Sequence, residues 1–130
     1  MPTILVVDDE DDVRSFVRHV LEVGGYTVLD TSDPQHALRI ASQEPAHLLL
    51  TDVVMPLMKG TELARRLQTL SPSTKVLLMS AYTLSDITAS AYPVITKPFT
   101  SDTLAARVRQ VLNQPSPFAR PRPQGGRPCG

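Results

Sequence analysis

Residues 48–60 read Leu-Leu-Leu-Thr-Asp-Val-Val-Met-Pro-Leu-Met-Lys-Gly, and this stretch decides the fold that we expect. Its short apolar run predicts a buried strand over residues 46–51. The run ends on one carboxylate, Asp52, and the Pro56 and Gly60 that follow predict a turn directly after it. A buried strand that delivers an acid to a loop usually does so because the loop faces a ligand. The function therefore depends on which other groups reach the same edge of the sheet.

Four other short apolar runs have the composition of strands, and helical patterns separate them along the chain. This alternation predicts right-handed crossovers and an α/β fold with one parallel sheet. Ligands of such sheets bind beyond the carboxyl ends of the strands, where the candidate functional groups of this chain lie. The other runs, with the groups that follow them, are residues 4–7 with Asp8 and Asp9, residues 27–29, residues 75–79 with Ser80, and residues 94–96 with Lys97.

Helix-end signals mark the segments between these runs. Residues 32–34, Ser-Asp-Pro, are typical of a helix start, and we expect Thr100 to cap the last helix. We expect residues 83–91 to form only a short, weak helix, because β-branched residues and Ser are frequent there. The helix that begins at residue 60 or 61 is expected to turn three leucines inward, namely Leu63, Leu67 and Leu70.

The composition fits one domain, which we place at residues 1–113, followed by a disordered tail or linker at residues 114–130 that is rich in Pro, Gly and Arg. The formal charge is balanced, and no apolar run approaches the ~20 residues of a membrane span. We therefore expect neither a nucleic-acid nor a membrane partner. The one cysteine, Cys129, excludes an internal disulfide, and we recognise no signal peptide, so we expect a cytoplasmic location.

Three carboxylates, those of Asp8, Asp9 and Asp52, should converge at the carboxyl edge of the sheet. Their mutual repulsion in a partly dry site is relieved by a hard divalent cation, and ligation by oxygen alone points to Mg²⁺. Lys97 and the Ser80 hydroxyl would offset the charge of an arriving phosphoryl group, with Asp52 as the natural nucleophile. Each residue alone has a more ordinary reading, as a helix-end acid, a turn residue or a solvated lysine. Their joint arrival at one edge favours a functional site.

The chain resembles the receiver domain of two-component response regulators over about residues 3–113. This resemblance implies a doubly wound, flavodoxin-like sheet with strand order 2-1-3-4-5 and helices on both faces. Each motif is modest alone, but their ordered combination is specific. The motifs are VDDE at residues 7–10 with Val13 and Arg14, DVVMPLMKG at residues 52–60, MSA at residues 79–81, and TKPF at residues 96–99.

The resemblance implies a phosphorylated aspartate and a metal ion. A sensor histidine kinase or a histidine phosphotransfer protein would phosphorylate Asp52, with Mg²⁺ bound beside it. Asp9, Asp52 and the backbone carbonyl of Val54 would coordinate the ion, and Asp8 would act largely through water. The output would be a change in the binding of a downstream protein whose identity the sequence does not reveal.

The resemblance also assigns a phosphoryl pocket and a switch. The bond between Lys97 and Pro98 is expected to be cis. Phosphorylation would pull Ser80 inward and change a partner-binding surface that includes Tyr82 and Val94. The groups assigned to the phosphoryl oxygens are the side chains of Ser80 and Lys97 and the backbone N–H groups of Val53 and Ala81.

The chain departs from this family between residues 80 and 97, where it is shorter by about one helical turn of ~3.6 residues. The family places Phe or Tyr three residues before the lysine; here that position is Val94, with Tyr92 two residues earlier. A phosphorylation-independent interaction module with an intact pocket is therefore an alternative to a working phosphoswitch. We expect a monomer or a weak homodimer, because the usual dimer face is altered.

A Mg²⁺-dependent phosphohydrolase is a remote alternative. Such an enzyme needs an acid–base residue near the nucleophile, and Val54, two residues after Asp52, has no such group. We therefore expect a signalling module and not an enzyme.

Overall fold

Five strands form one parallel sheet in the computed structural model, which describes residues 2–81 and 92–113. The order across the sheet is β2-β1-β3-β4-β5, so the chain starts near the middle and winds outward in both directions. All neighbouring strands are parallel, which confirms the predicted α/β fold and strand order. The strands are β1 (Thr3–Val7), β2 (Thr27–Thr31), β3 (Leu48–Asp52), β4 (Lys75–Ser80) and β5 (Val94–Thr96).

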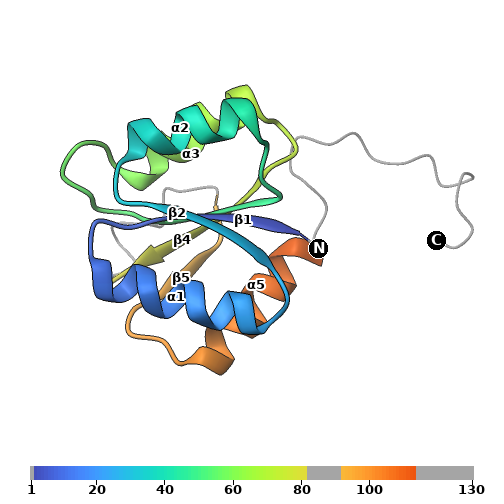
Figure 1. The fold of residues 1–130 in the computed structure, drawn as a ribbon. Helices are drawn as coiled ribbons and strands as arrows, with labels where there is room; N and C mark the ends of the chain where they lie inside the picture. The colour runs from blue at the N-terminus through green and yellow to red at the C-terminus, as the bar shows by residue number, and fades with distance from the viewer. Residues whose placement is uncertain (1, 82–91, 114–130) are drawn as a thin grey trace, which may run out of the picture.

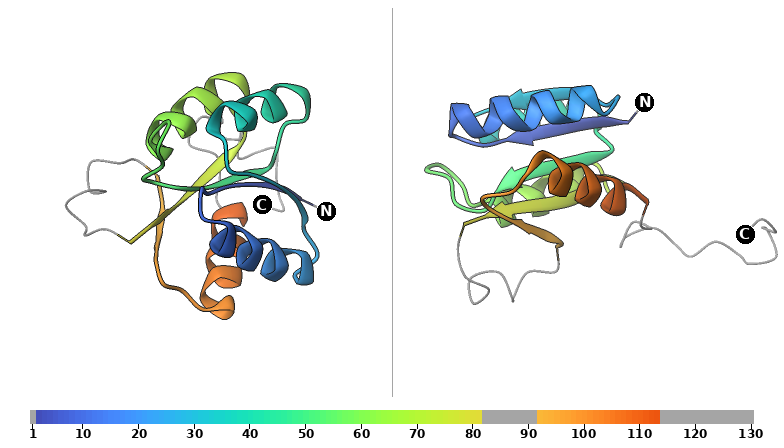
Figure 2. Two further views of the ribbon diagram at one scale, coloured as in Figure 1. Left: turned by 60° about the vertical axis from the view of Figure 1, so that its left-hand side comes forward. Right: turned by 90° about the horizontal axis from the view of Figure 1, so that it is seen from below.

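Helices cover both faces of the sheet (Figures 1 and 2). α2 (Pro34–Gln43) and α3 (Gly60–Leu70) lie on one face, and α1 (Asp11–Val23) and α5 (Ser101–Asn113) lie on the other. The loops that follow β1 and β3 lie side by side at the left of Figure 1. The carboxyl ends of the strands therefore meet at one edge, where a doubly wound sheet binds its ligands.

Alternate residues of the central strands face opposite helix layers, as the two-residue period of a strand requires. Leu5 and Leu49 pack in the cluster formed with α2 and α3, whereas Ile4 and Leu50 pack in the cluster formed with α1 and α5. All four side chains are fully buried. Burial on both faces explains why these strands read as continuous apolar runs in the sequence.

The helix-start signals of the sequence are confirmed. The Asp33 carboxylate accepts a hydrogen bond of 2.9 Å from the N–H of Gln35 at the start of α2. The Thr100 hydroxyl accepts one of 3.1 Å from the N–H of Thr103 at the start of α5. Gly25, with a φ of 95°, lets the chain leave α1 and turn into β2.

One predicted core residue is wrong. Leu63 and Leu67 are buried, but Leu70, at the end of α3, is 53% exposed. The buried stripe of α3 also includes Ala64 and Gln68. These two residues shift the centre of the stripe around the helix, so Leu70 lies at its margin, where the helix ends.

Two predictions concern parts of the chain outside the described residues. They are the weak helix at residues 83–91 and the tail at residues 114–130. The helix α5 ends at Asn113, and the domain boundary at that residue stays a prediction. Within residues 2–81 and 92–113, no helix has both the length and the apolar character needed to cross a membrane.

Candidate functional site

Strand periodicity brings Asp8, Asp52 and Lys97 to the same side of the sheet. Each of the three lies two residues after a strand residue that packs in the core beneath α1 and α5. Since a strand repeats its facing direction every second residue, the polar side chains continue toward that side at the carboxyl edge. The preceding core residues are Val6, Leu50 and Ile95.

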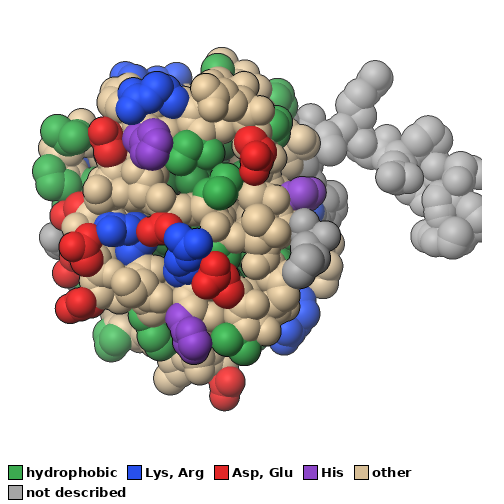
Figure 3. Space-filling model, viewed as in Figure 1, with side chains coloured by type: hydrophobic (Ala, Val, Ile, Leu, Met, Phe, Trp, Pro, Cys, Tyr) green, Lys and Arg blue, Asp and Glu red, His purple; other side chains and the backbone are tan. Residues whose placement is uncertain are grey.

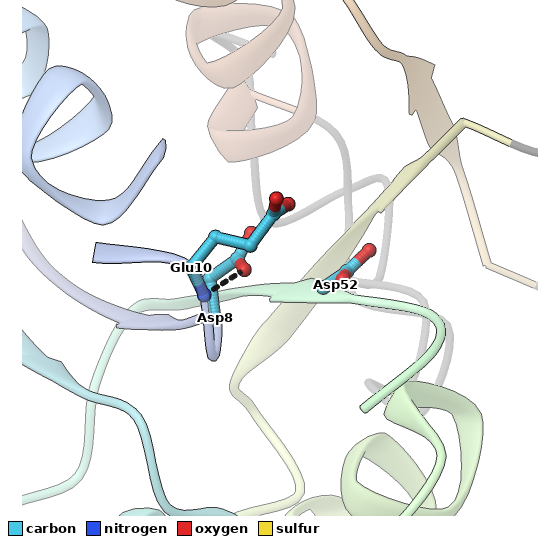
Figure 4. A group of neighbouring side chains, drawn as sticks. All are labelled: Asp8, Glu10 and Asp52. Carbon is cyan, nitrogen blue, oxygen red and sulfur yellow. Dashed lines mark hydrogen bonds between the residues drawn. The ribbon is translucent and has the colours of Figure 1, made fainter. Parts of the chain in front are cut away.

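A group of three carboxylates lies at this edge (Figure 4). One oxygen from each of Asp8, Glu10 and Asp52 lies within 4.8 Å of the others. Asp8 and Glu10 come from the loop after β1, and Asp52 comes from the last position of β3. The backbone N–H of Glu10 donates a 2.9 Å hydrogen bond to the Asp8 carboxylate, which shapes the loop. Asp8 and Asp52 are buried, and Glu10 is exposed at the mouth of the site.

Lys97 is the cation that contacts these three carboxylates of Asp8, Glu10 and Asp52, which we call the acid group. Its Nζ lies 3.0 Å from Asp8 Oδ2, 3.5 Å from Asp52 Oδ1 and 3.5 Å from Glu10 Oε1. Its side chain is 13% exposed, so water screens these contacts only weakly. The bond from Lys97 to Pro98 is cis, as the resemblance implied.

Burial raises the pKa of the Asp52 carboxyl from 3.8 to about 6, because the charged form loses hydration. The Lys97 ammonium pulls this pKa down and the Asp8 carboxylate pushes it up, and burial prevails. Burial would lower the pKa of Lys97, but its bond to Asp8 and the nearby Asp52 and Glu10 charges raise it. At neutral pH the site therefore holds an anionic Asp52 whose charge depends on the cation beside it.

Replacement of Lys97 by Met is expected to raise the pKa of Asp52 above 6, by about one unit. The reason is that Lys97 is the cation that stabilises the carboxylate form. A carboxyl carbon NMR titration of the metal-free protein measures this pKa. Lys75→Met is the matched control, since Lys75 is also partly buried but donates to the Leu112 carbonyl at the other end of β4. An unchanged pKa in Lys97→Met would contradict the assigned geometry.

Of the acids at residues 8–12, the structure groups Asp8 and Glu10 with Asp52, whereas the sequence analysis expected Asp8 and Asp9. Asp8 lies in the group as predicted, but Asp9 is exposed and is not part of the group within the described residues. Asp9 lies two residues after Val7, in the turn that follows β1, and this turn leaves its side chain exposed. Glu10 joins instead, because its longer side chain reaches back from the turn. The sequence placed Glu10 in the acidic run but carried no signal for this role.

The other predicted site residues occupy several positions around this edge. Ser80 is buried at the end of β4, and its carbonyl accepts the N–H of Lys97 at 2.8 Å. The N–H of Val53 donates to the Met79 carbonyl at 2.9 Å, so a phosphoryl oxygen would have to share this donor. Ala81 is exposed beside the site.

The remaining predicted residues concern the ion and the switch. Val54 is 45% exposed in the loop after β3. Val94 begins β5 and packs, half-buried, against the cluster beneath α2 and α3. Tyr82 lies outside the described residues. The roles predicted for these three residues stay predictions.

An apolar cavity of about 400 Å³ lies beside Lys97. The rings of Phe16 on α1 and Phe99 after β5 stand 6.3 Å apart along it. Phe16 is 41% exposed, which is high for a large apolar side chain. The site therefore opens next to a surface suited to a protein partner. The lining residues are Asp12, Val13, Phe16, Ala81, Lys97, Pro98 and Phe99.

The donor set of the acid group fits Mg²⁺. Its three ligand groups are carboxylates, and neither nitrogen nor sulfur donors belong to it among the described residues. Oxygen ligands alone suit a hard cation and disfavour zinc. The approach of one ammonium to all three acids also shows that their oxygens face one point that a cation can share.

Comparison with known proteins reveals a family model that matches residues 4–109, described as the response regulator receiver domain. The response regulator receiver protein CpdR of Brucella abortus is 35% identical over 118 residues, which are 86% of this chain and 98% of that protein. The phosphate regulon transcriptional regulatory protein PhoB of Pseudomonas aeruginosa is 34% identical over 88% of this chain. This chain spans only 53% of PhoB, about half of its length.

Solved structures show the same likeness in three dimensions. The chemotaxis protein CheY4 of Vibrio cholerae matches with a TM-score of 0.78 and 29% identity, over 85% of this chain and 98% of that one. The receiver domain of the hybrid histidine kinase CckA matches with a TM-score of 0.75 and 34% identity, over 85% of this chain and 99% of that one.

Proposed function

This chain belongs to the response regulator receiver domain family of two-component systems, and from this premise we propose that Asp52 is its phosphoacceptor. Its acidic pocket of Asp8, Glu10 and Asp52 fits a phosphoacceptor aspartate with Mg²⁺. The observation that carries the assignment is the position of Asp52. Its carboxylate ends the central strand, lies among the other acids and faces the Lys97 ammonium at 3.5 Å.

The proposed reaction transfers one phosphoryl group to an oxygen of Asp52. The carboxylate attacks phosphorus, and a P–O bond forms while the P–N bond to the donor imidazole breaks. The imidazole keeps the bonding electrons and takes a proton from water. The Lys97 ammonium donates to the phosphoryl oxygens as well as to the carboxylates, and the Ser80 hydroxyl and the Ala81 N–H also donate to these oxygens. The Val53 N–H would be shared between a phosphoryl oxygen and the Met79 carbonyl.

Mg²⁺, when bound, neutralises charge on the phosphoryl oxygens and aligns them for attack. Asp8, Glu10 and Asp52 would hold it, since their oxygens face a common point. Asp9 and the Val54 carbonyl, which the resemblance assigns to the ion, lie on the same two loops. A site with both sets would keep the oxygen-rich coordination that Mg²⁺ prefers.

Receiver domains interact with histidine kinases and phosphotransfer proteins. For this chain we propose such a protein as the phosphodonor, docked over the apolar cavity beside Lys97. The exposed ring of Phe16 would be covered by the donor, close to the acid group. We also propose that the domain acts on a downstream protein. In the same proposal the chain is a monomer or a weak homodimer and is located in the cytoplasm.

A receiver domain is a signalling module, and we propose that this one does not turn over substrates. Val54, exposed two residues after Asp52, offers no acid or base for hydrolysis. The second candidate, a phosphorylation-independent interaction module, is favoured by Val94. This residue has no ring to report the position of Ser80, and it packs toward the α2 and α3 side.

Treatment with acetyl phosphate and Mg²⁺ is expected to add one phosphoryl group to the wild-type protein, as measured by intact-mass spectrometry. Asp52→Asn and a chelator should each abolish the gain, because they remove the nucleophile and the ion. Asp102→Asn is the matched control, since Asp102 is an exposed acid in the first turn of α5 and does not belong to the acid group. Equal labelling of wild type and Asp52→Asn would refute the assignment.

The same samples separate a working switch from an interaction module. Beryllofluoride with Mg²⁺, followed by NMR, should shift the signals of residues 82–95 if the switch works. Shifts confined to the acid group would favour the interaction module.

A further inference from the structure

Arg14 on α1 holds three groups at once, and one of them belongs to the acid group. Its Nη1 donates to the main-chain carbonyl of Asp8 at 2.9 Å, its Nε to Asp30 Oδ2 at 2.9 Å and its Nη2 to Asp11 Oδ1 at 2.7 Å. The side chain is only 18% exposed, so it is packed in place. The flat guanidinium offers several N–H donors in fixed directions, which lets one arginine serve all three acceptors.

Asp8 is consequently held from two sides. Its carboxylate binds Lys97 inside the site, and its carbonyl binds Arg14 outside the site. Its N–H donates to the Thr31 carbonyl at 3.3 Å, which ties the same residue to β2. Because the carbonyl and the side chain share one Cα, a fixed peptide limits the positions that the carboxylate can take.

Asp30 on β2 anchors this arrangement. Its Oδ2 binds Arg14 and its Oδ1 binds Nη1 of Arg18, and its side chain is 21% exposed. Figure 3 shows basic and acidic side chains alternating across the middle of the face that α1 and β2 form. Arg18 is a natural comparison for Arg14. Within the described part of the chain its ion pairs are with Asp30 and Glu22, and they do not include the acid group.

The acid group needs such support because its members repel one another. Asp8 and Asp52 are buried acids that share one lysine with Glu10. Repulsion between them favours outward movement of the loop after β1, which carries two of the three acids. A restraint on the peptide at Asp8 opposes that movement without adding a ligand to the site.

We propose that Arg14 is a positioning residue of the phosphorylation site, which fixes the Asp8 peptide from outside so that its carboxylate stays turned toward Asp52 and Lys97. The proposal rests on the phosphoacceptor function proposed above. Arg14 contacts neither the phosphoryl group nor the ion. It acts through the loop, with Asp30 as its fixed point.

The test compares Arg14→Met with Arg18→Met, since both remove an arginine from Asp30 and only the first releases the Asp8 carbonyl. Mg²⁺ affinity is measured by calorimetry, and hydrogen exchange of the Glu10 amide is measured by NMR in metal-free buffer. Arg14→Met should weaken Mg²⁺ binding by about tenfold and speed Glu10 exchange, because the bond from this amide to Asp8 loosens. Arg18→Met should leave both close to wild type.

Equal Mg²⁺ affinity and equal Glu10 exchange in wild type and Arg14→Met would overturn the proposal, as would equal losses in Arg14→Met and Arg18→Met. If Arg14→Met does not fold, Arg14→Lys and Arg18→Lys repeat the comparison with the charge retained. The single ammonium nitrogen of a lysine cannot reproduce the planar fork that sets three nitrogens of Arg14 against three separate acceptors, so the same order of effects is expected. Both readouts are independent of phosphorylation. A wild-type protein that acetyl phosphate fails to label refutes the role of Asp52, whereas Mg²⁺ affinity and Glu10 exchange decide the role of Arg14.

Discussion

Asp52→Asn is expected to unfold in metal-free buffer at pH 7 with a free energy up to about 3 kcal/mol larger than that of the wild type. The reason is the pKa of the Asp52 carboxyl, which rises from 3.8 to about 6 in the folded chain because of burial. Between these two values the folded state binds more protons than the unfolded state. Wild-type stability therefore falls as the pH rises through this window, and the whole loss is present above pH 6.

Asparagine carries no charge, so the variant avoids this loss while Lys97 keeps its contacts with Asp8 and Glu10. Urea unfolding at a series of pH values measures the difference, which should shrink toward zero as the pH approaches 4. Adding Mg²⁺ should stabilise the wild type and reduce the gap, because the ion binds the folded acid group. Asp9→Asn, which changes an exposed acid outside the group, should not reproduce the gain. A less stable Asp52→Asn at pH 7 would contradict the raised pKa.

Gly60→Ala is expected to lower the free energy of unfolding by about 2–4 kcal/mol and to impair phosphorylation of Asp52. A Cβ at position 60 would overlap the carbonyl oxygen of Asp52 and lie 2.9 Å from its carbonyl carbon and 3.0 Å from the Val53 Cα. These are main-chain atoms, so relief requires the end of β3 or the start of α3 to move. The Gly60 N–H also donates to the Val53 carbonyl at 2.7 Å, which holds the two segments together.

The control for this substitution is Gly24→Ala at the end of α1. There a Cβ would meet the Leu21 carbonyl oxygen at 3.4 Å and the Tyr26 ring at 3.5 Å, and the backbone is right-handed helical. Little loss of stability is expected. Urea unfolding together with acetyl phosphate labelling measures both effects. Gly60→Ala with wild-type stability and labelling would show that the loop after β3 yields without disturbing Asp52.

The sequence predicted the architecture because local patterns carry it. Apolar runs, proline and glycine signals and the cap at Asp33 are short-range features, and each predicted element within the described residues is present. Leu70 was predicted wrongly for a related reason. Leucine spacing alone does not show that Ala64 and Gln68 are also buried on α3, and these two residues set the centre of its inner face.

The site was predictable to the extent that strand ends are predictable. Asp8, Asp52 and Lys97 follow three apolar runs, and the carboxyl ends of parallel strands meet at one edge, so their convergence could be read from the chain. The choice between Asp9 and Glu10 could not. This choice depends on the conformation of the turn after β1 and on where the Glu10 side chain extends from it. The sequence of five acids at residues 8–12 specifies neither.

By itself, the sequence determined the order of strands and helices along the chain, the family that the chain resembles and the edge at which its acids gather, because short stretches of neighbouring residues encode each of these. Only the tertiary structure showed which acids share Lys97. It also showed that a side chain at position 60 would overlap the main chain of Asp52, and that Arg14 donates to the Asp8 carbonyl. These facts join residues from separate loops, strands and helices. Distances across such junctions arise from packing of the whole domain, which no local pattern in the chain specifies.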